Sequence, residues 1–219
     1  MSIENPPEEK IITNCSKYLK LLEYMHSQGI KKPLLRGDSN AYTELTKRNV
    51  DTRKPSLTPE NIFNITDKWF EDNFGVRARS QSIFATTSTQ QASEYGHIHY
   101  IFPIKKFNII HSNKIDDLYA HLGERAISEK INSLYGNINV PKKYKNIAQY
   151  YEENYPKYFE NAIRAMLDTF EYKKNDYANA FNSGNEIMII TKTFYIVEKQ
   201  QWVNEFFEEF IYGRDIYGV

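Results

Sequence analysis

Hydrophobic positions near the amino end recur at helical spacing. Leu19, Leu22 and Met25 fall near one face of a helix, and Gly29 follows as a residue type that commonly ends helices. The pattern predicts an N-terminal helix over residues 11–29.

A second helix start follows a polar stretch. Thr58 supplies a capping hydroxyl, Pro59 suits the first helical position, and Glu60 places an acid in the first turn. We expect this helix to end near Gly75. The polar residues before it, 38–56, are expected to form a loop.

Short runs rich in β-branched and aromatic residues indicate strands. They do not alternate regularly with helices, which argues against a doubly wound sheet and favours a mixed α+β fold. The expected strands cover 34–37, 82–87, 98–104, 107–110, 186–190 and 194–197.

The middle of the chain changes to helical spacing. Residues 114–135 and 144–171 are expected to be helical and to form an insert over 114–171. A polar loop over 172–185 and an aromatic helix over 200–212 should follow. The length of 219 residues suits a single domain, 1–219, that carries this insert.

Composition narrows the possible classes of protein. The 28 basic and 28 acidic residues cancel, so the basic excess typical of a general nucleic-acid binder is missing. The single cysteine, Cys15, allows neither an internal disulfide nor a cysteine zinc site. The chain has no apolar run of membrane-spanning length, and its first residues lack signal-peptide features. We therefore expect a cytoplasmic protein without membrane association.

The first of three segments that could carry binding or catalytic chemistry is Leu35-Arg36-Gly37. Arginine presents a planar fork that suits phosphate, and glycine lets a ligand approach the backbone. The alternative is a surface arginine before a turn.

The other two segments carry hydroxyls and a carboxylate. Thr86, Thr87 and Ser88 follow an aromatic strand, where they could brace a site or simply cap a short helix. Glu186 begins an apolar strand, where a carboxylate is costly unless it is paired or functional. The alternative for Glu186 is a solvated acid at the edge of a strand.

Taken in order, the segments resemble the arginine–serine–glutamate branch of the ADP-ribosyltransferases. Leu35-Arg36-Gly37 matches the first motif, Phe84-Ala85-Thr86-Thr87-Ser88 the second with threonine in place of the leading serine, and Glu186-Ile187-Met188-Ile189 the third. The resemblance covers about residues 30–112 and 172–200. It implies a split, mostly antiparallel β core with surrounding helices. The chain is also similar to small proteins that T4-like phages encode, which would place it in the host cytoplasm.

The resemblance also implies roles at an NAD substrate, without a metal. Arg36 would hold a phosphate or ribose hydroxyl, and the Gly37 backbone would face the nicotinamide amide. Glu186 would accept a hydrogen bond from the nicotinamide-ribose 2′-hydroxyl and stabilise the charge that develops there. Thr86, Thr87 and Ser88 would brace the site, with Thr86 bonding Glu186. Tyr95 would stack on nicotinamide, with core packing as the alternative.

Two features bear on the acceptor. Arginine-modifying members carry Glu or Gln two residues before the catalytic glutamate, where this chain has Gly184, and Asn185 cannot act as a base. The loop over 172–185 corresponds in position to a target-recognition loop. Its aromatic residues could stack on a base or serve as packing anchors: Tyr172, Tyr177 and Phe181.

The expected activity is transfer of ADP-ribose from NAD to a protein or nucleic acid, with release of nicotinamide. One alternative is an inactive binding module of the same fold that blocks a host or defence protein. Another is a structural virion or assembly protein in which Arg36, Thr86 and Glu186 do not converge. His97 and His99 share a strand face but lack the third ligand that a metal site needs.

Overall fold

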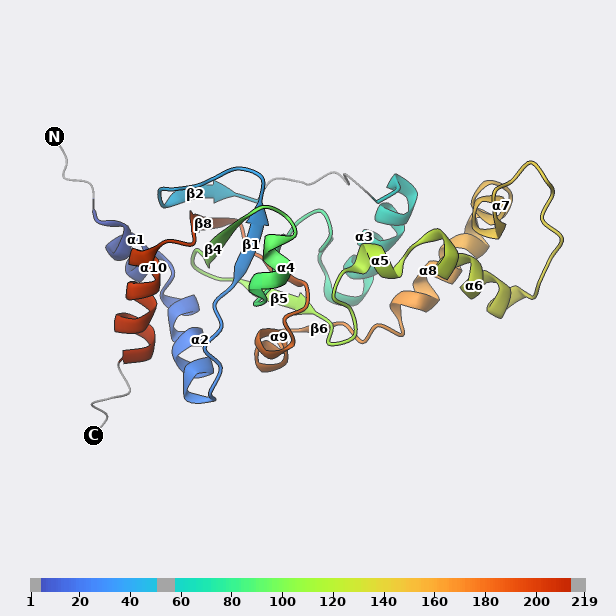
Figure 1. Ribbon diagram of the computed structural model, residues 1–219. Coiled ribbons are helices and arrows are strands. Elements are labelled where there is room, and N and C mark those ends of the chain that lie inside the picture. Colours follow the sequence, from blue (N-terminus) through green and yellow to red (C-terminus); the bar gives the residue numbers. More distant parts are fainter. Residues whose placement is uncertain (1–4, 51–57, 214–219) are drawn as a thin grey trace. The chain divides into compact units, whose positions relative to one another are not determined.

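The computed structural model describes residues 5–50 and 58–213 (Figure 1). Part of the loop expected over 38–56, residues 51–57, lies outside the described residues. The chain divides into two compact units. Unit 1 comprises Met1–Asp51, Ser82–Asn113 and Lys173–Val219, and unit 2 comprises Thr52–Gln81 and Lys114–Tyr172. The expected insert over 114–171 thus falls in unit 2, together with an earlier stretch of the chain.

Unit 1 contains two antiparallel sheets, in agreement with the α+β class. One has the order β1-β4-β8-β2, formed by β1 (Leu35–Asp38), β4 (His97–Pro103), β8 (Thr193–Glu198) and β2 (Thr46–Asn49). The other has the order β3-β7-β5-β6, formed by β3 (Ile83–Ala85), β7 (Ile187–Ile190), β5 (Asn108–His111) and β6 (Lys173–Lys174). Strand β2 lies where a loop was expected. Its sequence, TKRN, is entirely polar and only alternate residues are partly buried, so no hydrophobic pattern indicates a strand.

A backbone pair joins the two sheets. The Leu35 N–H donates to the Thr86 carbonyl at 2.7 Å, and the Thr86 N–H donates back to the Leu35 carbonyl at 2.8 Å. Because β1 is at the edge of its sheet, this pair links that edge to the end of β3. We call this contact the sheet junction.

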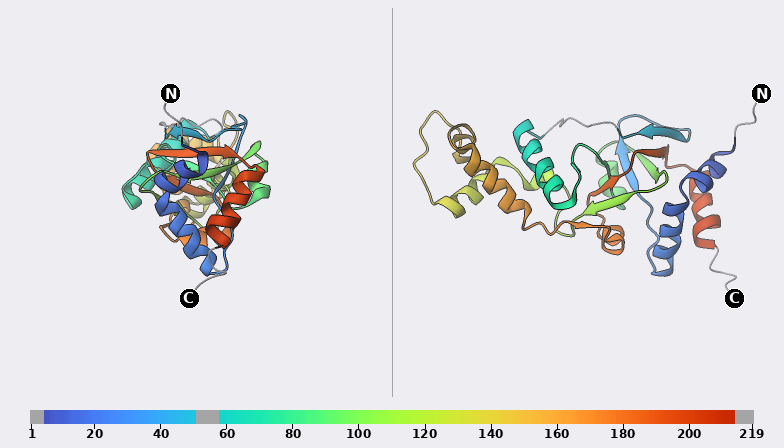
Figure 2. Two further views of the ribbon diagram at one scale, coloured as in Figure 1. Left: turned by 90° about the vertical axis from the view of Figure 1, so that its left-hand side faces the viewer. Right: turned by 180° about the vertical axis from the view of Figure 1, so that it is seen from behind.

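Helices of unit 1 cover these sheets, as the views from other sides also show (Figure 2). They are α1 (Pro7–Asn14), α2 (Ser16–Ser27), α4 (Thr89–Ser93), α9 (Tyr177–Ser183), α10 (Gln201–Phe206) and the π-helix η1 (Phe207–Tyr212). The single helix expected over 11–29 is two helices, which break at Cys15. The expected loop over 172–185 instead contains β6 and α9, and α9 ends at Gly184 in the left-handed conformation that glycine favours.

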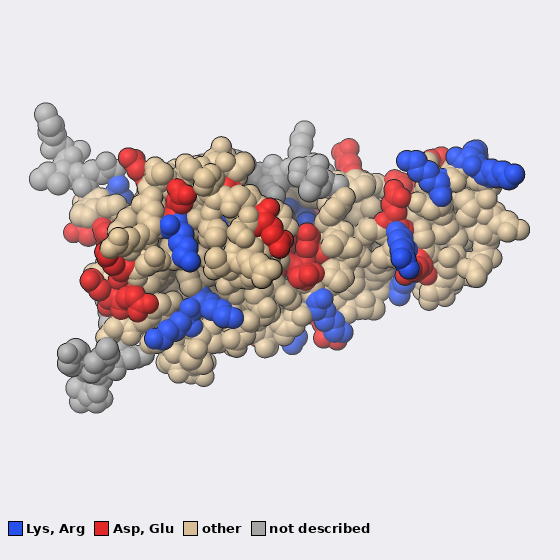
Figure 3. Space-filling model, in the orientation of Figure 1, with Lys and Arg blue, Asp and Glu red and all other residues tan. Residues whose placement is uncertain are grey.

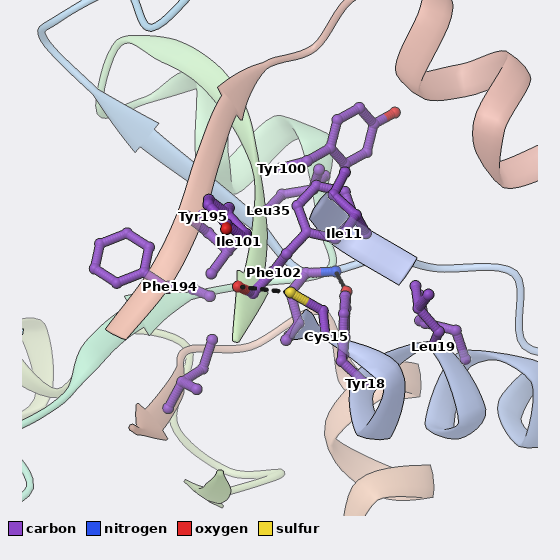
Figure 4. Packing of buried hydrophobic residues seen from close by; sticks show 14 of the residues in the cluster. Ile11, Cys15, Tyr18, Leu19, Leu35, Tyr100, Ile101, Phe102, Phe194 and Tyr195 are labelled. Atoms are coloured by element: carbon purple, nitrogen blue, oxygen red, sulfur yellow. Dashed lines mark hydrogen bonds between the residues drawn. The ribbon is translucent and has the colours of Figure 1, made fainter. Parts of the chain in front are cut away.

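The core of unit 1 joins the N-terminal helices to the first sheet (Figure 4). The Leu34 N–H donates to the Tyr18 hydroxyl at 2.8 Å, and the Cys15 thiol lies 3.7 Å from the Phe102 carbonyl oxygen. Burial raises the pKa of the Cys15 thiol to about 12, so the thiol stays protonated and packs as a small apolar group.

In the described part of unit 2 the regular structure is helical. Its elements are α3 (Glu60–Phe74), α5 (Leu118–His121), α6 (Glu124–Tyr135), α7 (Ile147–Asn154) and α8 (Pro156–Leu167). The expected helix over 58–75 is confirmed by α3, and α8 packs against α3, α6 and α7. Both expected middle helices are broken: Gly123 precedes α6, and Pro156 begins α8, because proline cannot continue the preceding helix.

Candidate active site

The sheet junction brings together the three segments that the sequence singled out. Leu35 pairs with Thr86, and β3 pairs with β7 so that Ala85 lies opposite Ile187. Thr86 therefore lies between the strand that carries Arg36 and the residue that precedes β7, Glu186. If the match to the motifs were accidental, the three segments would be expected to lie apart. Their backbones instead converge.

Arg36 reaches across the junction. Its Nη1 donates to the Phe84 carbonyl at 3.1 Å, and its Nε lies 3.6 Å from Asp38 Oδ2. The Arg36 side chain remains 24% exposed. Burial raises the pKa of Asp38, but hydrogen bonds from Asn40 and the charge of Arg36 outweigh burial and leave that pKa below its usual value. The arginine is thus held by a carbonyl and a carboxylate that stays ionised.

Gly37 has one covered face and one open edge. A Cβ at this position would lie 2.0 Å from the Ala92 carbonyl oxygen, so only glycine fits beneath α4. The N–H and carbonyl of Leu35 both point at Thr86. Because backbone groups alternate along a strand, the N–H and carbonyl of Gly37 point to the same edge of β1. A donor and an acceptor are therefore directed beyond the junction.

The hydroxyl residues brace the junction by local bonds. Thr86 Oγ1 donates to the Gly184 carbonyl at 2.5 Å and accepts from the Ser88 N–H at 3.0 Å. The hydroxyl has one hydrogen, so its donated bond goes to the turn before Glu186. Thr87 Oγ1 donates to the Phe181 carbonyl at 2.9 Å.

Ser88 also caps α4. Its side-chain oxygen accepts the Gln91 N–H at 3.2 Å, which confirms the capping alternative for this residue. The three hydroxyl residues thus fix the strand-to-helix corner and the turn before Glu186.

Glu186 is half-buried and lies directly before β7. The strand was expected to begin with Glu186 but begins one residue later. Gly184, two residues before it, has a φ of +74°, and a Cβ there would approach Ser88 Cβ at 3.4 Å. A side chain at this position would therefore be strained. The backbone conformation that ends α9 explains why no second acid precedes Glu186.

A polar row crosses the first sheet beside Arg36. Register places Arg36 opposite His99, and His99 opposite Glu198, so the three share one face. His97 Nδ1 lies 3.2 Å from Glu198 Oε1. His99 is 0% exposed, and its Nε2 accepts the Tyr42 N–H at 3.2 Å. The sequence did not indicate Glu198, because only strand register places it here; Asp38 was missed although it lies two residues after Arg36 on the same strand.

Burial lowers the pKa of His99, although the nearby charges of Asp38 and Glu198 oppose that shift. Since Nε2 accepts a hydrogen bond, the neutral ring carries its hydrogen on Nδ1. The row therefore contains a neutral histidine and not a further cation.

Tyr95 remains accessible beside Gly37. It is 54% exposed, and its Cβ would lie 2.7 Å from a Cβ at position 37. The core-packing alternative therefore does not describe its ring. Its position at the covered face of Gly37 keeps it near the junction.

The aromatic residues expected to contact a target are packed instead. Phe181 is 0% exposed in the core of unit 1, so it cannot stack on a target, and that expectation is wrong. Tyr177 contacts the Phe107 ring edge-on at 6.1 Å. Tyr172 belongs to unit 2, where its ring packs on Phe70 at 4.9 Å. Packing anchors, the alternative left open by the sequence, account for these contacts.

Comparison with protein-family models, with curated proteins and with solved structures gives no match. Among the described residues, no group of three or more His, Cys, Asp or Glu is arranged to hold a metal ion. None of the helices formed by those residues has the length and apolar character needed to cross a membrane.

Proposed function

We propose that unit 1 binds NAD at the sheet junction and transfers ADP-ribose to a macromolecular acceptor, protein or nucleic acid, with release of nicotinamide. The observation that carries this proposal is the convergence of Arg36, Thr86 and Glu186 through the Leu35–Thr86 backbone pair. These are the segments, in the order, that resemble the ADP-ribosyltransferase motifs.

The residues at the junction suit the parts of NAD. Arg36 offers a guanidinium, on a partly exposed side chain, that is already oriented by Phe84 and Asp38, which suits a phosphate. Gly37 directs one donor and one acceptor to the open edge of β1, a pair that complements a carboxamide. Tyr95 provides an exposed ring close to Gly37 that could cover an aromatic base.

Glu186 is the residue we propose to act on the reacting bond. The bond between ribose C1′ and the nicotinamide nitrogen breaks, and its electrons leave with nicotinamide. Positive charge develops on the ribose in the transition state, and a fixed carboxylate stabilises that charge more than it stabilises the ground state. The acceptor then forms the new bond to C1′ and gives up its proton.

Gly184 limits the acceptor. The position two residues before Glu186 has no side chain to orient or deprotonate the acceptor. We therefore propose that arginine is not the target. The acceptor must either lose its proton readily or be oriented by its own binding to the protein.

Nicotinamide release and NAD binding, measured separately, test the proposal. Glu186→Gln keeps the shape of the side chain and removes its charge. We expect NAD affinity within a few-fold of the unmutated chain and a rate of nicotinamide release lower by about 100-fold or more. Arg36→Lys loses the planar fork, and we expect NAD binding weakened by about 10-fold.

Glu44→Gln in unit 1 and Arg77→Lys in unit 2 make the same chemical changes at exposed positions and should alter neither quantity. Absence of NAD binding by the unmutated chain would overturn the proposal. Binding without nicotinamide release, with or without cell lysate as a source of acceptor, would instead favour the inactive binding module.

A further inference from the structure

Six tyrosine rings form one continuous network in unit 2. Tyr151 lies at its centre and is buried, and it contacts the rings of Tyr135 at 5.9 Å and Tyr155 at 5.4 Å. The remaining contacts are edge-on pairs with centroids 5.0–6.5 Å apart. We call this the tyrosine cluster: Tyr135, Tyr144, Tyr150, Tyr151, Tyr155 and Tyr158.

Two members of the tyrosine cluster face solvent. Tyr155 is 44% exposed and Tyr158 is 49% exposed. They lie at the start of α8, where Pro156 fixes the turn between α7 and α8. Their positions are supported by buried Tyr151, so they offer aromatic surface that costs little ordering when a ligand binds.

Exposed lysines accompany these tyrosines in the sequence. Lys142, Lys143 and Lys145, which we call the basic segment, are all exposed, and Lys157 lies between Tyr155 and Tyr158 along the chain. Lys143 Nζ lies 4.7 Å from the centroid of the Tyr144 ring, so cation and ring are in contact. Figure 3 shows lysine or arginine side chains gathered where the α6–α7 connection lies.

The local charge differs from that of the whole chain. Residues 130–158 contain five lysines and two glutamates, a net charge of +3, whereas the chain as a whole is neutral. The glutamates, Glu152 and Glu153, are both on α7. Lysines therefore outnumber acids along this stretch, although Glu152 and Glu153 share α7 with Tyr150 and Tyr151.

We propose that the tyrosine cluster and the basic segment bind a single strand of nucleic acid. Unpaired bases stack on aromatic rings, and lysines neutralise the backbone phosphates; single-strand binding proteins combine these two features. Exposed tyrosine also suits a protein interface, but the basic segment does not, because lysine is depleted in interface cores. The proposal concerns unit 2 alone and does not rest on the proposed NAD chemistry.

Fluorescence anisotropy of the full-length chain with labelled oligonucleotides of about 20 nucleotides, longer than a small binding site, tests this proposal. Single-stranded RNA, single-stranded DNA and duplex DNA of one sequence form the three arms. We expect saturable binding of one or both single strands and weaker binding of the duplex, whose bases are already stacked. The first two arms show which backbone is preferred.

Two sets of variants separate the phosphate and base contributions. Lys142→Gln, Lys143→Gln and Lys145→Gln together should lower the slope of log affinity against log salt concentration by about 2, at about 0.7 for each phosphate that is no longer neutralised. Tyr155→Ala and Tyr158→Ala should each weaken binding by about 5- to 150-fold, the cost of losing one stacked base. Tyr155→Phe and Tyr158→Phe should bind almost normally, because they keep the ring.

Matched controls lie in unit 1. Lys17→Gln, Lys20→Gln and Lys47→Gln together remove the same charge from exposed positions, and Tyr24→Ala removes a tyrosine that is 59% exposed. Both should leave the salt slope and the affinity unchanged. The lysine variants are all on the surface, so they keep the test decisive even if a tyrosine variant is less stable.

Three results would overturn the proposal. One is the absence of saturable binding to either single strand at low salt. Another is an unchanged salt slope in the triple variant of the basic segment. The third is duplex binding that equals single-strand binding, since stacking of unpaired bases would then contribute nothing.

Discussion

Units 1 and 2 fix their side chains in different ways. In unit 1, strands from distant parts of the sequence pair, and polar groups such as Thr86 and His99 are buried and oriented by backbone bonds. In unit 2, helices form the regular structure that is described; Asp67 and Ser80 are buried and bonded, but the three lysines of the basic segment and two of the clustered tyrosines are exposed. A reaction needs groups fixed to within a fraction of an ångström, whereas docking tolerates mobile side chains. On this basis we propose chemistry for unit 1 and partner binding for unit 2.

The two tryptophans allow the units to be followed separately. Trp69 lies in unit 2 and Trp202 in unit 1. Fluorescence of Trp202→Phe thus reports unit 2, and fluorescence of Trp69→Phe reports unit 1. This separation matters because a chain with two units need not unfold in one transition.

The largest effect on stability is expected from Phe181→Ala. This side chain is 0% exposed, so truncation should leave a cavity and lower the free energy of unfolding of unit 1 by about 3–5 kcal/mol. Urea unfolding of the Trp69→Phe background measures it. A change below about 1 kcal/mol would mean that the ring is free to contact a target, contrary to its packing here.

A smaller loss is expected in unit 2 from Asp67→Ala. Asp67 is 3% exposed and accepts hydrogen bonds from the backbone N–H groups of Arg79 and Ser80 and from the Ser80 hydroxyl. Removing the carboxylate should cost about 2–3 kcal/mol, since it leaves buried donors unsatisfied. Unfolding in the Trp202→Phe background should register the loss. An equal loss in unit 1 would contradict the division into two units.

Thr86→Val tests the brace at the sheet junction. Valine keeps the shape but removes the bond to the Gly184 carbonyl, which should cost about 1–3 kcal/mol and weaken NAD binding as the turn before Glu186 loosens. Thr86→Ser should restore both quantities, because it keeps the hydroxyl. Normal NAD binding by the valine variant would show that this bond does not position the site.

The smallest effect is a pH dependence confined to unit 1. Burial lowers the pKa of His99, and burial likewise lowers the pKa of His111, although Asp176 opposes the latter shift. The folded state therefore binds these protons less readily than the unfolded state does. Stability should be complete above the unfolded pKa near 6.5 and fall as the pH drops below it toward the folded values.

The check is denaturation of each single-tryptophan background across this pH range. His99→Gln and His111→Gln together should flatten the profile of unit 1. Unit 2 contains neither histidine, so this double substitution should leave its profile unchanged. A unit 1 profile that the double substitution does not flatten would contradict this account.

Local signals in the sequence predicted much of the fold. The capping residues before Glu60 marked α3, and the apolar run after Glu186 marked β7, because these features act within a few residues. Strand β2 was missed because its polar residues carry no pattern of burial. The breaks at Cys15 and Gly123 were missed because spacing of apolar residues continues across them.

The candidate site was predictable in its segments but not in its bonds. Order along the chain pointed to Arg36 and Glu186. The bond from Thr86 to Gly184 and the approach of Glu198 to His97 depend on turn geometry and strand register, which are set by contacts between distant residues. The same limit explains why Phe181, aromatic and in a polar stretch, was expected at the surface.

The most direct test of the NAD proposal uses NAD labelled in its ADP-ribose portion, incubated with the purified chain and a whole-cell lysate, beside Glu186→Gln. The account predicts that label enters protein or nucleic acid only with the unmutated chain, and that nicotinamide is released in step. No incorporation and no nicotinamide release by the unmutated chain, or equal incorporation by Glu186→Gln, would contradict it.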